Sequence, residues 1–205
     1  MVWIVTGSYS NIKFDAINTN TMYMYPISAK QYINNAWVDV VLKAYQSGKW
    51  NENIITLYSN GDTCSEITGG WSASGYNSAY GDNTGFSMTS THLVCKSRSG
   101  SSTNTAGIGG TVNPIRISGK KYLKISGTFS NYRGSSLYNV GLLSAKGSTN
   151  SPVTYTRITG ADGGFEKTLD ISSINGSYYV YVEAVVTSDS AVYDSYMYVN
   201  KITLE

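Results

Sequence analysis

Two stretches of the chain alternate apolar and polar residues with the period of two that predicts a half-buried β-strand. Residues 121–130 place Leu123, Ile125 and Phe129 on one face. Residues 178–187 place Val180, Val182, Ala184 and Val186 on one face and Tyr179, Tyr181, Glu183 and Thr187 on the other. Both stretches are therefore predicted to be strands with one face turned toward a core.

Shorter runs of β-branched and aromatic residues, divided by Gly-, Ser- and Asn-rich turns, predict further strands. They lie at 66–71, 85–90, 92–96, 111–118, 138–144, 153–158, 165–171, 193–199 and 201–204. Residues 25–44 show some helical periodicity, but their Tyr, Ile, Val and Asn content favours strands. We therefore expect an all-β chain in which residues 63–205 form a jelly-roll-like β-sandwich.

A thirteen-residue spacing of aromatic residues precedes the expected sandwich. Tyr32 and Trp37 enclose four residues, Tyr45 and Trp50 repeat the arrangement, and a third unit begins at Tyr58 without a Trp. The middle of each unit (Asn-Asn, Ser-Gly or Asn-Gly) suits a two-residue hairpin turn, which needs residues that tolerate positive φ. The pattern predicts a β-meander whose aromatic residues flank the turns.

Such a meander does not bury a core by itself, so we expect residues 1–62 to attach to a neighbour. The neighbour is another copy of the chain or another protein. Residues 1–28, with short apolar pieces, are predicted to form strands or an extended arm. The candidate attachment residues are Tyr32, Trp37, Tyr45, Trp50 and Tyr58. The alternative is that these aromatic side chains only stabilise their own hairpins.

Charge is sparse, at 14% of residues, and the formal net charge is +2. No basic stripe is present, which argues against nucleic-acid binding. No apolar run approaches the ~20 residues of a membrane span, and the apolar start of the chain is too short for a signal peptide. We therefore expect a protein without a nucleic-acid or membrane partner.

Catalytic chemistry is not predicted. His92 is the one histidine, and no acid lies near it in the sequence to complete a catalytic triad. The sequence singles out no pair of carboxylates for glycoside hydrolysis. The acids from residue 62 onward include Asp62, Glu66, Asp82, Asp162, Glu166, Asp170, Glu183, Asp189 and Asp194.

No cofactor is expected, although two oxygen-rich loops offer ligands for a structural Ca²⁺. These loops are residues 160–164 and 188–190, and ordinary solvated turns are the alternative. Cys64 and Cys95 have no metal-ligand spacing. We interpret them as two buried free thiols in preference to a disulfide.

Aromatic residues are the positive signal for a binding site. Trp71, Tyr76 and Tyr80 lie in the Gly- and Ser-rich stretch 69–81. Exposed aromatic rings stack on sugars, and Tyr combined with Ser and Gly also forms adaptable binding loops. The competing interpretation, which we favour for Trp71, is that the ring anchors the sandwich core.

Three stretches carry a resemblance to a known class of proteins. They are the Tyr/Trp hairpins of 36–50, the junction 57–71 with its Thr-Gly-Gly-Trp element, and the run 168–180. These stretches resemble minor structural proteins of tailed phages of Gram-positive bacteria, of the tail, baseplate or head-decoration type. The sandwich of those proteins is similar to a carbohydrate-binding module. The resemblance covers roughly residues 29–205 and implies a location on the virion, after assembly in the host cytoplasm.

Three functions follow as hypotheses. The first is a peripheral tail or baseplate appendage that displays a host-glycan-binding sandwich. The second is a capsid decoration or head-fibre protein without an essential ligand, and the third is a stand-alone bacterial carbohydrate-binding module. In the first two, the partners are other virion proteins and the chain belongs to a symmetric assembly.

Overall fold

The computed structural model describes the chain with gaps. For its first 53 residues it describes the strands and their pairing, at 2–3, 12–18, 25–33, 36–39, 43–46 and 49–52. The further described residues are 54–77, 85–99, 106–132, 136–147, 149–186 and 193–205. The chain divides into two compact units, Met1–Ile54 and Ile55–Glu205.

The first unit contains two three-stranded antiparallel sheets. One has the order β1-β5-β6, with β1 at Val2–Trp3, β5 at Lys43–Gln46 and β6 at Lys49–Glu52. The other has the order β2-β3-β4, with β2 at Ile12–Asn18, β3 at Tyr25–Ile33 and β4 at Ala36–Asp39. The preference for strands over a helix in residues 25–44 is thus confirmed.

Antiparallel pairing joins the strands that flank two of the predicted turns, and a β-bridge closes the third. Tyr32 pairs with Trp37 across β3 and β4, and Tyr45 pairs with Trp50 across β5 and β6. At the third position a β-bridge joins Ser59 to Asp62 around Asn60-Gly61. Asn60 and Gly61 have φ of 45° and 91°, the positive values that a two-residue hairpin turn requires.

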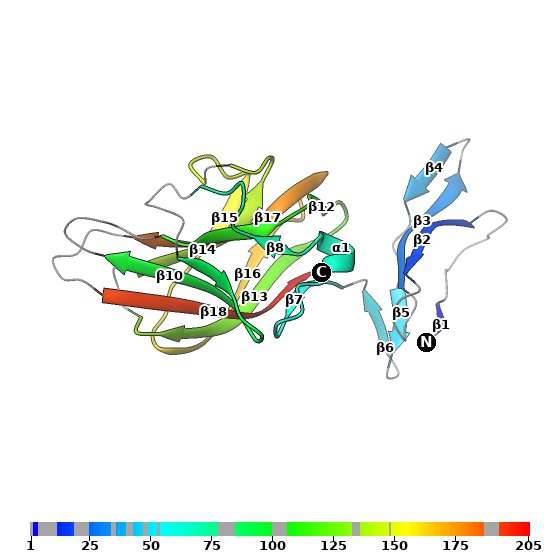
Figure 1. Cartoon of the computed structure of the whole chain (residues 1–205). Coiled ribbons are helices and arrows are strands. Elements are labelled where there is room, and N and C mark those ends of the chain that lie inside the picture. Colours follow the sequence, from blue (N-terminus) through cyan, green and yellow to red (C-terminus); the bar gives the residue numbers. More distant parts are fainter. Residues whose placement is uncertain are drawn as a thin grey trace. The chain divides into compact units, whose positions relative to one another are not determined.

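The second unit is a β-sandwich of two antiparallel sheets (Figure 1). We call the first the β18 sheet, with the order β16-β13-β18-β10-β9 and β7 paired to β18. Its strands are β7 (Ile55–Ser59), β9 (Phe86–Met88), β10 (Leu93–Ser99), β13 (Tyr122–Ser130), β16 (Gly163–Asp170) and β18 (Tyr193–Leu204).

The second is the β17 sheet, with the order β15-β14-β17-β11-β8 and β12 paired to β17. Its strands are β8 (Trp71–Ser72), β11 (Ile108–Thr111), β12 (Ile115–Arg116), β14 (Ser136–Leu143), β15 (Thr154–Ile158) and β17 (Ser177–Val186). From β15 to β18 the chain crosses between the sheets at every connection. The predicted all-β fold with a sandwich is therefore confirmed.

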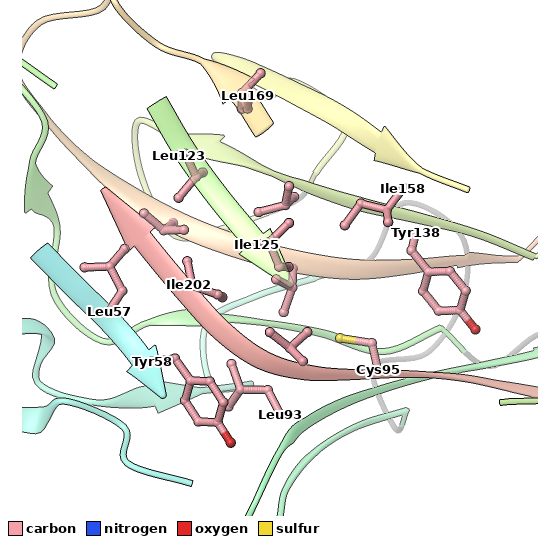
Figure 2. Packing of buried hydrophobic residues seen from close by; sticks show 14 of the residues in the cluster. Leu57, Tyr58, Leu93, Cys95, Leu123, Ile125, Tyr138, Ile158, Leu169 and Ile202 are labelled. Carbon is pink, nitrogen blue, oxygen red and sulfur yellow. The ribbon is translucent and has the colours of Figure 1, made fainter. Parts of the chain in front are cut away.

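The main core lies between the sheets, where the alternating strands turn their apolar faces inward (Figure 2). Leu123, Ile125 and Phe129 of β13 are at most 4% exposed, as their spacing predicts. Val180 and Val182 of β17 are fully buried in the same core. Burial of this apolar surface, at about 25 cal/mol per Å², is the main force that holds the sheets together.

The third aromatic unit belongs to the sandwich, because β7 pairs with β18. Leu57 and Tyr58 are fully buried beside Ile202 (Figure 2). The Tyr58 hydroxyl accepts a hydrogen bond of 2.9 Å from the Gly61 amide. The division at residue 54 therefore differs from the sequence-based division at residue 62, and Tyr58 serves the sandwich core rather than an exposed attachment surface.

The strand predicted at 66–71 is wrong in its first part, where the structure has the helix α1 (Ser65–Thr68). Left-handed residues, Cys64 and Gly69, bound this single turn, and the Gly69 amide donates to the Ser65 carbonyl. Thr68 is buried, and its hydroxyl donates to nearby backbone carbonyls. Among the described residues no helix is long and apolar enough to cross a bilayer.

The strands predicted at 193–199 and 201–204 are one continuous strand, β18. A β-bulge joins the two halves, since Val199 pairs with Gly127 and Lys201 with Ser126, which leaves Asn200 without a partner on β13. The Asn200 carbonyl instead accepts a hydrogen bond from the Asn60 amide.

Cys64 and Cys95 are buried free thiols, as the sequence analysis preferred. Burial is the main cause that raises the pKa of Cys64 from 9.0 to about 11, and the nearby Asp62 and Glu66 act in the same direction. Burial also raises the pKa of Cys95.

Candidate functional site

Trp71 is a core residue in the structure, with 3% of its surface exposed. Its indole Nε1 donates a hydrogen bond of 2.8 Å to the Leu57 carbonyl. Leu57 lies at the irregularity of the β7–β18 ladder, where it has no paired residue on β18. Trp71 thus stabilises the attachment of β7 to the sandwich and has no free ring face for a ligand.

Tyr76 is also buried, with 2% of its surface exposed. Its hydroxyl donates a 2.6 Å hydrogen bond to the Thr111 carbonyl, and burial raises its pKa. Tyr76 packs in a second apolar cluster with Ile108, Leu143 and Tyr181. The predicted exposed ring faces are therefore absent at Trp71 and Tyr76, whereas Tyr80 lies outside the described residues.

A pocket lies next to the second cluster, on the outer face of the β17 sheet. The pocket has a volume of about 130 Å³. Its lining residues come from β14, β15, β17 and the segment that connects β14 to β15: Asn139, Thr149, Asn150, Pro152, Tyr155, Arg157, Tyr181 and Glu183. Tyr181 joins the pocket to the Tyr76 cluster, so the cluster supports the pocket wall.

Strand register builds this pocket from two rows of residues. Arg157, Asn139 and Glu183 lie side by side on β15, β14 and β17. Residues in one row of an antiparallel sheet share a face and lie about 5 Å from their neighbours. In a second row Gly141 lies between Tyr155 and Tyr181. Residues that are far apart in the sequence thereby line one pocket.

Glu183 is a buried carboxylate, with 1% of its surface exposed. It accepts hydrogen bonds from Thr149 Oγ1 at 2.6 Å and from Asn139 Nδ2 at 3.4 Å. The Asn139 side-chain oxygen Oδ1 is buried and has no hydrogen-bond partner. Because most buried polar atoms have partners, this acceptor is a position where a donor from water or from a ligand can bind.

Two side chains of the edge strand β15 complete the pocket and are accessible to solvent. Tyr155 is 48% exposed, and Arg157 is exposed as well. Gly141 provides room beside Tyr155, because a Cβ atom at Gly141 would lie 2.7 Å from the Tyr155 Cβ. The pocket therefore has a buried, acceptor-rich part and an accessible edge with an aromatic ring and a guanidinium.

The acids of the pocket and the one histidine of the chain are the groups that bear on catalysis. Of the described residues that line the pocket, Glu183 is the only acid, whereas glycoside hydrolysis typically requires two carboxylates. His92 lies elsewhere, on the β18 sheet side, where its Nδ1 is 2.7 Å from Thr91 Oγ1 and its ring packs edge-on against Tyr198. Among the described residues the His92 ring has this hydroxyl beside it but no carboxylate paired with it, so a triad is not completed there.

The loops considered for Ca²⁺ do not converge on a metal site in the described part of the chain. Asp162 accepts a hydrogen bond from the Tyr132 amide, so it closes a loop. No group of three His, Cys, Asp or Glu side chains among the described residues is placed to hold a metal. Residues 188–190 lie outside the described residues.

Sequence reasoning missed most of this pocket. Glu183 appeared among the acids and on the outward face of its strand, but nothing distinguished it from the others. Asn139, Tyr155 and Arg157 carry no sequence signal that marks them as site residues. The available signal was a single Glu between outward-facing residues of an otherwise apolar strand, since an acid there must be paired or functional when it is buried.

No protein-family model matches the chain, and no curated protein matches its sequence. The β-sandwich and its pocket are therefore the basis for a functional interpretation.

Proposed function

We propose that this protein is a glycan-binding β-sandwich protein whose ligand occupies the pocket on the β17 sheet. The observation that carries the proposal is the combination of the buried acceptors of Glu183 and Asn139 with the exposed ring of Tyr155. Sugar hydroxyls donate hydrogen bonds to carboxylate and amide oxygens, and a sugar ring stacks on an aromatic face. The pocket offers both kinds of contact within two rows of a sheet.

The geometry also explains why a polar ligand would be preferred. Thr149 and Asn139 hold the Glu183 carboxyl group in place in the pocket wall, which fixes the position of Asn139 and its side-chain oxygen. A ligand that supplies no donor would leave the Asn139 oxygen unsatisfied, which typically costs about 1–3 kcal/mol. Selection of hydroxyl-rich ligands follows from this penalty.

We place this binding module on a phage virion, as a peripheral tail or baseplate appendage that contacts host-surface glycans. Support comes from the resemblance of the Tyr/Trp hairpins to minor structural proteins of tailed phages. In this proposal the strands before residue 55 attach the protein to other virion proteins. Copurification of the protein with phage particles tests the placement, and its absence from purified particles would contradict it.

Binding to intact Gram-positive cells by the fluorescently labelled protein tests the glycan proposal. We expect the wild type to coat host cells and the Glu183→Gln and Tyr155→Ala variants to lose most of this signal. Tyr122→Ala is the matched control, because Tyr122 is similarly exposed (40%) but lies on the β18 sheet. A melting curve for each variant verifies that the fold is retained.

Two results would contradict the glycan proposal. One is coating that is unchanged in both pocket variants, and the other is no coating of any strain in a broad host panel. A protein that copurifies with particles but binds no cell would be better described as a capsid decoration or head-fibre protein.

A further inference from the structure

Arg157 adds a positive charge to the accessible edge of the pocket, and binding of a neutral sugar does not require this charge. Its side chain is exposed, and it has no ion-pair partner among the described residues. It lies in the same row as Asn139 and Glu183, with β14 between its strand and that of Glu183. Two interstrand spacings separate Arg157 from Glu183 along this row, which is about 10 Å between backbones.

We infer that the glycan is acidic, with a carboxylate or phosphate group at Arg157 and a hydroxyl group at the acceptors of Glu183 and Asn139. This inference rests on the proposed function, because it specifies the ligand of the same pocket. The separation of about 10 Å suits a ligand that spans a sugar ring and one substituent.

The charges fix the orientation of such a ligand. A carboxylate or phosphate beside the buried Glu183 and the Asn139 oxygen would lose its water and meet acceptors in place of donors, which is costly. At Arg157 the same group would meet a planar fork of donors that matches its geometry. The acidic group therefore points toward the accessible edge strand, and the neutral hydroxyl points inward.

The edge position of β15 makes this contact accessible. β15 is the last strand of the β17 sheet, and Tyr155 and Arg157 project from the same face of it because they are two residues apart. A sugar ring on Tyr155 would thus place its substituent near Arg157. The pair Tyr155 and Arg157 supplies stacking and charge, whereas the pair Asn139 and Glu183 supplies acceptors.

Glycan-array binding with matched oligosaccharides tests the inference. Each neutral oligosaccharide is compared with a counterpart that carries a uronic acid and with one that carries a phosphate. We expect the wild type to bind at least one acidic series about tenfold more tightly than its neutral counterpart, and the preference to weaken as salt is added. The series that binds identifies carboxylate or phosphate as the group recognised.

The Arg157→Gln variant separates charge recognition from general binding. We expect it to lose the preference for acidic glycans, so that its affinity for them falls to about that for their neutral counterparts. Lys167→Gln is the matched control, because it removes an exposed positive charge from β16 of the other sheet. Arg157→Lys keeps the charge without the fork and is expected to retain only part of the preference.

The outcomes distinguish this inference from the proposal on which it depends. Equal binding of neutral and acidic glycans would overturn the acidic ligand. A preference for acidic glycans that survives Arg157→Gln would overturn the placement of the acidic group at Arg157. Either result would leave glycan binding intact. An absence of binding to every neutral and acidic glycan would overturn both.

Discussion

Asn139 on β14 and Glu183 on β17 lie directly opposite each other, and Asn139 Nδ2 donates a hydrogen bond of 3.4 Å to Glu183 Oε2. With its amide nitrogen turned to the carboxylate, Asn139 presents its oxygen Oδ1 without a partner. The opposite orientation of the amide would bring two acceptors together. The pair therefore explains how a buried acid and an unsatisfied oxygen coexist in one pocket wall.

The Thr149→Val variant tests the hydrogen bond that holds the buried carboxylate. Valine keeps the shape of threonine but removes the hydroxyl that donates to Glu183 Oε1 at 2.6 Å. We expect the free energy of unfolding to fall by about 1–3 kcal/mol, because a buried acceptor loses a donor. Chemical denaturation measures this change.

Thr168→Val is the control for that variant, since Thr168 is exposed on β16 and is expected to change stability by less than about 0.5 kcal/mol. Equal stability of Thr149→Val and the wild type would show that the hydroxyl does not support Glu183.

The Gly141→Ala variant tests the close packing of β14 and β15. A Cβ at this position would lie 2.7 Å from the Tyr155 Cβ, so β15 has to move away. We expect lower stability, by about 1–3 kcal/mol, and weaker glycan binding because Tyr155 and Arg157 move with the strand. Gly164→Ala is the control, since the nearest atom to its Cβ, the Gly127 carbonyl oxygen, is 3.9 Å away. Similar effects of both substitutions would argue against a specific role of Gly141.

The Trp71→Phe variant tests whether this residue is structural, as its burial indicates. It removes the 2.8 Å hydrogen bond to the Leu57 carbonyl while it keeps most of the apolar contact. We expect a loss of about 1–3 kcal/mol in the free energy of unfolding, whereas Trp71→Ala is expected to cost about 3–5 kcal/mol.

The Tyr178→Phe variant is the control. It also removes one hydrogen bond, from the Tyr178 hydroxyl to the Asn175 carbonyl, but this bond lies at the exposed surface. If Trp71→Phe weakened glycan binding without lowering stability, the structural role of Trp71 would be refuted.

The raised pKa of Cys64 predicts a loss of stability at alkaline pH. Its pKa in the fold, about 11, lies above the ordinary 9.0, so the folded protein holds the thiol proton more tightly than the unfolded chain. The contribution of the protonated thiol to stability is fully present below pH 9 and is lost as the pH rises toward 11. The free energy of unfolding, followed from pH 7 to 11 under reducing conditions, measures this loss.

Cys64→Ser isolates the effect of the thiol, since the serine hydroxyl does not titrate in this range. We expect the stability of the wild type to fall more steeply than that of the variant between pH 9 and 11. Parallel pH profiles for the two proteins would contradict the assignment to Cys64.

The alternation of apolar residues determined the fold class and most strands of the sandwich. Leu123 and Ile125 are buried on the predicted face, because a period of two puts the apolar side chains on one face of the strand and only that face can turn toward the core. Asn60 and Gly61 determined their hairpin turn in the same local manner. The helix α1 could not be predicted, because its four residues, between left-handed Cys64 and Gly69, are too few to show a helical period of apolar positions.

The sequence by itself therefore determined that this protein is an all-β chain with tight hairpins and a sandwich, since these features depend on the nearest neighbours of each residue. Only the tertiary structure decided that Trp71 and Tyr76 are buried and that Asn139, Arg157 and Glu183 share a row. The register of strands far apart in the sequence sets that row. Many registers are compatible with the same alternation, and the packing of the whole sandwich selects one.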